Sequence, residues 1–130
     1  MKGFGNNNKA NKKSIEKKTN NLQKDKLISN ALSLHSRGKF KEALEIYNFL
    51  IQDKIYDPRI FNNLASIYSQ KKQFDKAIYL LNESIKKFPN FIEAHLNLAN
   101  VLVAKGRSDT AKSILNKAIE LNPKYLRTYS

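Results

Sequence analysis

The sequence contains no cysteine, only three prolines and only four glycines, and these shortages limit what the chain can be. Without cysteine there is no disulfide framework, no thiolate metal site and no cysteine nucleophile, which fits a reducing environment. No apolar run approaches the roughly 18 residues that a membrane-spanning helix needs. No apolar segment follows the basic N-terminus, so the sequence predicts no secretory signal. We therefore expect a cytoplasmic protein.

Acidic residues are also scarce, with 11 against 24 basic ones and a formal net charge of +13. Much of this charge lies at the N-terminus, where residues 1–24 hold seven lysines and one glutamate. Residues 1–21 carry almost nothing apolar, so they cannot offset the entropy lost on ordering, and we expect a disordered tail. Such a tail either keeps the protein soluble or contacts nucleic acid or an anionic membrane weakly. An AT-rich genome would also explain the abundance of Lys, Asn and Ile.

What the chain does contain is a pattern that recurs at one fixed step, which we call the repeat step. Small side chains follow it in two series, and large apolar side chains and a proline follow it too: Ala31, Ala65, Ala99; Ala43, Ala77, Ala111; Leu34, Tyr68, Leu102; Tyr47, Leu81, Leu115; and Pro89, Pro123. A helix–turn–helix unit that recurs every ~34 residues is typical of a stacked helical solenoid. The pattern therefore predicts an all-α fold.

These residues resemble the tetratricopeptide repeat, whose motif has a small residue in the first helix, a glycine at the turn, and an alanine and a large residue in the second helix. The second repeat has Lys72 where glycine is usual, and the first lacks the closing proline. The resemblance covers about Lys24 to Tyr125. It implies a right-handed α-solenoid of three stacked helix–turn–helix repeats, at residues 22–57, 58–91 and 92–125.

Local signals mark where the helices begin and end. Gly38 ends the first helix because glycine takes a left-handed conformation at low cost. Asp57 and Pro58 begin the second repeat, since Asp accepts backbone N–H bonds as a cap and Pro fits the first helical turn. The second repeat turns at residues 71–73.

Residues 126–130 read as the start of a further helix that the chain does not complete. The last complete helix, from Ser108 to Leu121, offers apolar side chains that no full helix would follow: Ile114, Leu115, Ala118 and Ile119. Solenoids normally finish with a polar outer face. Three alternatives follow: the chain is the front part of a longer repeat array, it forms a homo-oligomer through the uncapped end, or the end frays in a monomer.

Catalysis is not expected. The two histidines, His35 and His95, lie far apart in the sequence and in different repeats, and His95 falls where a buried imidazole is usual. The sequence holds no metal-binding motif, phosphate loop or nucleophile elbow. Serines and aspartates are scattered without a convergent partner. The prediction is a non-enzymatic protein that needs no cofactor and no metal.

Stacked repeats form a concave groove lined by the first helix of each repeat. Helical phase predicts a groove that is apolar at its N-terminal end, rich in amides further on and nearly uncharged, with these binding residues: Ile28, Leu32, Asn62, Asn63, Ser66, Gln70, Asn97 and Asn100. His35, Ser69, Glu93, Leu96 and Val103 share the same face. An asparagine offers both a donor and an acceptor to the backbone of an extended peptide. The alternative is a polar, solvated helix face.

Asn63 and Asn97 lie one repeat apart and resemble the asparagine ladder of O-linked N-acetylglucosamine transferase, which holds extended polypeptide. The carboxylate clamp of chaperone-binding repeats fits poorly. Its Lys, Asn, Asn, Lys and Arg correspond here to Ile28, Leu32, Asn63, Glu93 and Asn97. We therefore expect a scaffold that binds an extended segment of a partner protein. The alternatives are an N-terminal appendage of a larger transferase-type system, and binding to nucleic acid or an anionic membrane through the tail.

Overall fold

The computed structural model describes residues 21–124, which form helices and turns with no strand among them. Residues 21–36 are helical, and five further helices follow: α2 (Phe40–Gln52), α3 (Pro58–Gln70), α4 (Phe74–Lys87), α5 (Ile92–Ala104) and α6 (Ser108–Leu121). The predicted lysine-rich tail, apart from residue 21, and the predicted start of a further helix at residues 126–130 lie outside the described part. No helix within residues 21–124 has the length and apolar character needed to cross a membrane.

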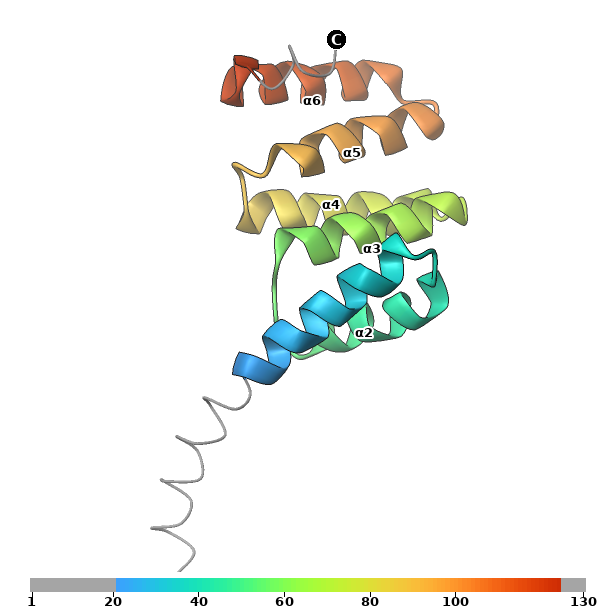
Figure 1. Ribbon diagram of the computed structural model, residues 1–130. Helices are drawn as coiled ribbons and strands as arrows, with labels where there is room; N and C mark the ends of the chain where they lie inside the picture. The colour runs from blue at the N-terminus through green and yellow to red at the C-terminus, as the bar shows by residue number, and fades with distance from the viewer. Residues whose placement is uncertain (1–20, 125–130) are drawn as a thin grey trace, which may run out of the picture. The chain divides into compact units, whose positions relative to one another are not determined.

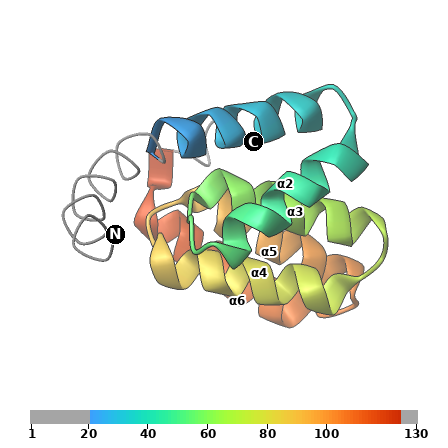
Figure 2. The ribbon, with the colours of Figure 1, turned by 90° about the horizontal axis from the view of Figure 1, so that it is seen from below.

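The chain divides into two compact units, one ending at Ile55 and the other beginning at Tyr56. The first unit contains a hairpin in which the helix of residues 21–36 runs to a turn and α2 returns (Figure 2). Its core consists of Ala31, Leu34, Ala43, Tyr47 and Leu50. Tyr47 Oη donates a hydrogen bond to the Ala31 carbonyl at 3.4 Å, which ties the two helices together.

The second unit contains α3, α4, α5 and α6, which follow one another as a stack of helices (Figure 1). Each helix packs on the next, and α3 also contacts α5 directly. The pairs α3–α4 and α5–α6 are therefore two helix–turn–helix repeats lying side by side. Their core is formed by buried apolar side chains from all four helices, among them Ile60, Phe61, Leu64, Ile67, Leu80, Leu81, Leu98, Val101, Leu102 and Ala111.

The small residues that recur at the repeat step occupy equivalent environments. Ala31, Ala65 and Ala99 are at most 1% exposed, and so are the alanines of the second helices, Ala43, Ala77 and Ala111. Helix backbones approach closely only where the side chains between them are small, and packed interiors leave little room for extra atoms. These alanines therefore set the close helix contacts within the repeats.

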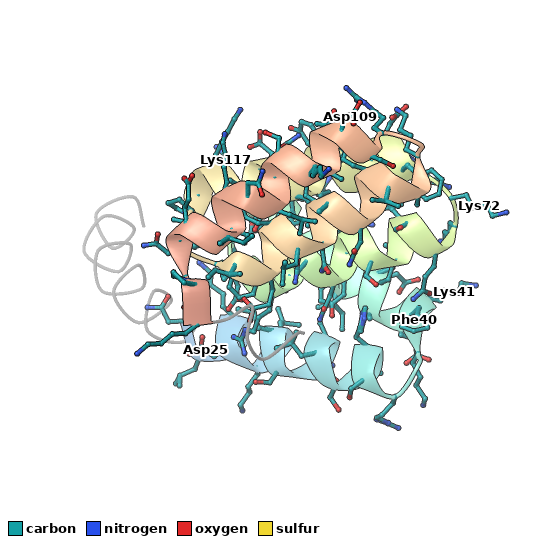
Figure 3. The ribbon with its side chains drawn as sticks, turned by 90° about the horizontal axis from the view of Figure 1, so that it is seen from above. Asp25, Phe40, Lys41, Lys72, Asp109 and Lys117 are labelled. Carbon is teal, nitrogen blue, oxygen red and sulfur yellow. The ribbon has the colours of Figure 1, made fainter. Side chains whose placement is uncertain are left out.

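The turns within the repeats require a left-handed backbone. Gly38 (φ +77°) and Gly106 (φ +87°) supply it without steric cost. In the middle repeat the same position is Lys72, which has φ 60°, and its side chain points away from the helices (Figure 3). Lys54 also has a positive φ, of 58°, just after α2. The structure thus accepts two non-glycine residues in a conformation that disfavours them.

The predicted helix start at Asp57 and Pro58 is confirmed. Asp57 has an extended backbone and accepts a 2.8 Å hydrogen bond from the Arg59 backbone N–H, while Pro58 occupies the first turn of α3. The Arg59 guanidinium also donates to both Asp57 carboxylate oxygens, at 3.0 and 2.7 Å. These hydrogen bonds and the positive charge hold the pKa of Asp57 below its usual value, although partial burial opposes the shift.

Candidate binding groove

A depression of about 210 Å³ lies where α3 and α5 run side by side. Polar side chains from both helices surround a floor of apolar ones, and the lining consists of Ser66, Ser69, Gln70, Asn97, Asn100, Ala65, Leu81 and Val101. Leu81 belongs to α4, so the floor of the depression is also the core contact between the two repeats. Buried packing between the helices thus positions the polar rim.

The structure brings four of the predicted groove residues into this depression: Ser66, Gln70, Asn97 and Asn100. Asn62 and Asn63 lie on the same helix, α3, and are half-buried, but they do not line the depression. Ile28 and Leu32 are half-buried in the first unit. Their participation in one continuous groove stays a prediction, as does a ladder of Asn63 and Asn97.

The lining contains no charged side chain. Each of its amides offers donors and an acceptor, and each hydroxyl offers both functions. The depression is smaller than the roughly 300–1,000 Å³ of pockets that enclose drug-sized ligands. Its size and polarity therefore suit one uncharged side chain together with the adjoining peptide backbone.

The apolar floor was not predicted as part of the site. Ala65, Leu81 and Val101 read from the sequence as core residues, and they are indeed buried. The depression above them forms where α3 and α5 lie next to each other. The repeat step marks Ala65 and Leu81 as contacts between helices, and this is the signal from which their place in the floor could have been found.

The two histidines have separate structural roles. His95 is 5% exposed, and its Nε2 lies 3.0 Å from the Pro89 carbonyl oxygen. Its Nδ1 is buried without a hydrogen-bond partner among the described residues. His35 packs edge-on against Phe40, with ring centroids 5.0 Å apart, and burial lowers its pKa. Within residues 21–124, no three His, Asp or Glu side chains gather to hold a metal ion.

Comparison with known proteins agrees with this architecture. The family model of the tetratricopeptide repeat matches residues 69–129. None of the curated proteins matches the chain.

Solved structures share the fold over most of the chain. The Yersinia enterocolitica chaperone SycD, crystallised with a peptide of the translocator YopD, is 26% identical, with 77% of this chain and 76% of SycD aligned and a TM-score of 0.71. The TPR2B domain of yeast Sti1, in a complex with pHsp70, is 22% identical over 78% of this chain and 81% of its own, with a TM-score of 0.71. PcrH from Pseudomonas aeruginosa is 20% identical over 78% and 77%, with a TM-score of 0.71.

The fold is therefore an all-α solenoid built from helix–turn–helix repeats. Residues 69–129 match the family model of the tetratricopeptide repeat, and the repeat step and the shared solved structures agree with that family.

Proposed function

We propose that this protein is a non-catalytic interaction scaffold that binds an extended, uncharged segment of a partner protein along α3 and α5. The observation that carries the proposal is the depression in which Ser66, Gln70, Asn97 and Asn100 surround an apolar floor. These polar groups come from two neighbouring repeats, so a bound segment would cross from one repeat to the next.

The chemistry of the lining defines the segment. Side-chain amides pair with the N–H and C=O groups of an extended backbone, which supplies affinity without reading much sequence. The apolar floor of Ala65, Leu81 and Val101 favours an apolar side chain at the central position of the segment. A charged side chain there would lose its hydration and gain no ionic partner, so the site selects against it.

The comparisons support peptide binding as the use of this fold. SycD, the structure at 26% identity, was crystallised with a peptide of its translocator. A carboxylate clamp is not the mode we propose, because the depression has no cationic side chain. A scaffold binds other proteins and needs no reaction chemistry. The lining of the depression contains no acid–base pair.

The experiment is selection of a displayed library of random peptides against the full chain, followed by titration of the selected peptides. The double variant Asn97→Ala/Asn100→Ala removes two amides of the rim and should weaken binding at least about tenfold, since each lost hydrogen bond costs about 1 kcal/mol. The matched control is Asn82→Ala/Asn116→Ala. These two asparagines are exposed, lie one repeat apart and belong to α4 and α6.

Selected peptides should be rich in uncharged residues, and the control variant should bind them as the wild type does. Equal binding by wild type and the Asn97/Asn100 variant, with both proteins folded by circular dichroism, would contradict the proposal. Selection of peptides that depend on a C-terminal carboxylate would contradict it as well.

A further inference from the structure

Cations gather at the turns within the repeats. Two of these turns belong to the second unit, and they lie at the same end of its stacked helices (Figure 1). An ion pair between Lys105, just after α5, and Asp75, in the first turn of α4, joins the two turns directly. We call this end of the second unit the turn edge, and its exposed cations are Lys71, Lys72, Lys76, Lys105 and Arg107.

These cations outnumber the carboxylates beside them. The carboxylates of the turn edge are Asp75 and Asp109, in the first turns of α4 and α6. Among residues 21–124, no carboxylate forms an ion pair with Lys71, Lys72 or Arg107. The charge of these three side chains is therefore available to a partner.

Lys72 is held in its turn at a conformational cost. Its φ is 60°, whereas Gly106 supplies the same turn one repeat later without steric penalty. Lys54 has a similar φ, but it adjoins Asp53 in the sequence and lies outside the turns within the repeats. Residues in sparsely populated backbone conformations concentrate at ligand-binding sites, where the strain holds a side chain in place. Since the Lys72 side chain points away from the helices (Figure 3), the strain serves its exposed ammonium group and not the packing.

We infer that the turn edge binds an acidic segment of a partner protein, whose carboxylates pair with Lys71, Lys72 and Arg107. The contact would cross from one repeat to the next, because these cations belong to two neighbouring turns. The segment should alternate acidic with uncharged residues, since Asp75 and Asp109 lie within the same edge and repel unbroken negative charge. This site goes beyond the proposed groove, whose lining contains no charged side chain.

The same features disfavour other polyanions. A single nucleic acid strand binds best where bases can stack on exposed aromatic rings. The rings next to these cations, Tyr68 and Phe74, are half-buried, and Lys76 Nζ lies 5.3 Å from the centroid of the Tyr68 ring. A nucleic acid duplex or an anionic membrane presents closely spaced negative charge. Either would bring that charge against the Asp75 side chain, which is 83% exposed.

The test is fluorescence anisotropy with the full chain and a labelled peptide in which glutamate and serine alternate. A peptide of about 12 residues reaches about 40 Å when extended, which is long enough to cross both turns. At about 50 mM NaCl, where screening is moderate, it should bind saturably with a Kd below about 1 mM. The same peptide with glutamine in place of glutamate should bind at least about tenfold more weakly, because it keeps the shape and loses the charge.

Lys72→Gly separates a binding role from a structural one. It should weaken binding of the acidic peptide at least about threefold while raising the midpoint of urea denaturation, because it removes the ammonium group and relieves the backbone. Damage to the fold would instead lower both. Lys72→Glu/Arg107→Glu should weaken binding at least about tenfold. Its matched control is Lys86→Glu/Lys117→Glu, which makes the same change of charge at exposed residues farther along α4 and α6 and should cost less than about threefold.

Three results would overturn the inference. The first is absence of binding by the acidic peptide. The second is equal loss of affinity in the turn-edge variant and its control, which would assign binding to the overall charge, including the seven lysines of residues 1–24. The third is tighter binding of an oligothymidylate or of phosphatidylserine vesicles than of the peptide, lost in Lys72→Gly, which would assign the turn edge to nucleic acid or to a membrane.

Discussion

Lys72 and Gly106 occupy the same turn position one repeat apart, and both have a left-handed backbone, with φ of 60° and +87°. The turn geometry is therefore imposed by the repeat and not by glycine. A residue with a Cβ costs about 1–2 kcal/mol in this conformation. The middle repeat bears that cost, because the packing of α3 on α4 fixes the turn.

Replacing this lysine by glycine should stabilise the protein. We expect Lys72→Gly to raise the free energy of unfolding by about 0.5–1 kcal/mol, since the relief of strain exceeds the entropy that glycine adds to the unfolded chain. Urea denaturation measures the change. Lys71→Gly is the control, because Lys71 has an ordinary φ of −81°, and it should destabilise. The explanation fails if both variants shift the midpoint in the same direction.

The reverse change at the third turn should destabilise. An added Cβ at Gly106 would meet no atom within 4 Å, so Gly106→Ala tests the backbone conformation alone. We expect a loss of about 1 kcal/mol, measured in the same urea titration. A neutral effect would show that the turn can relax to a negative φ.

Ser84 is fully buried, and its Oγ has no hydrogen-bond partner among the described residues. Ala118 occupies the same position one repeat later and is 1% exposed. Ser84→Ala should therefore stabilise by about 1 kcal/mol, because it removes an unsatisfied hydroxyl and raises helix propensity. Ala118→Ser should have the opposite effect. Thermal melts of the two variants, compared with the wild type, test this prediction. A destabilised Ser84→Ala protein would contradict it and would indicate a partner for the hydroxyl.

The cap at the start of α3 should depend on pH. The pKa of Asp57 is lowered in the folded protein, chiefly by the hydrogen bond from Arg59. The charged form therefore adds stability above the unfolded pKa of about 4, and this contribution is lost as the pH falls through the lower folded pKa. Asp57→Asn keeps a capping oxygen but no charge. Melting curves from pH 7 to pH 2.5 should show the wild type more stable at neutral pH and the two proteins converging in acid. A difference that does not change with pH would contradict this account.

Much of the fold was predictable because the repeat step is visible in a single sequence. The spacing of small, apolar and capping residues predicted where the first helix stops, near Gly38, and where α3 begins, near Asp57. It also predicted the burial of Ala65 and Ala99 and the pairing of the helices. The positive φ at Lys72 was not predictable from its type, since lysine has no preference for that conformation. There the geometry comes from tertiary packing.

The candidate site was predictable only in part. Helical phase gives the face on which Ser66, Gln70, Asn97 and Asn100 lie, and these residues do meet in one depression. It does not give the rotation and crossing of neighbouring helices, which decide that Asn62 and Asn63 lie outside the depression and that Leu81 forms its floor. Those quantities depend on how side chains of adjacent repeats interlock.

The salt dependence of peptide binding tests the central claim most directly. A selected, uncharged peptide should bind the full chain with a Kd that changes less than about twofold between roughly 50 and 500 mM NaCl, because the depression contains no charged side chain. A loss of affinity of about tenfold or more over this range would contradict the account, since it would place binding on the lysine-rich surface or tail of this basic protein.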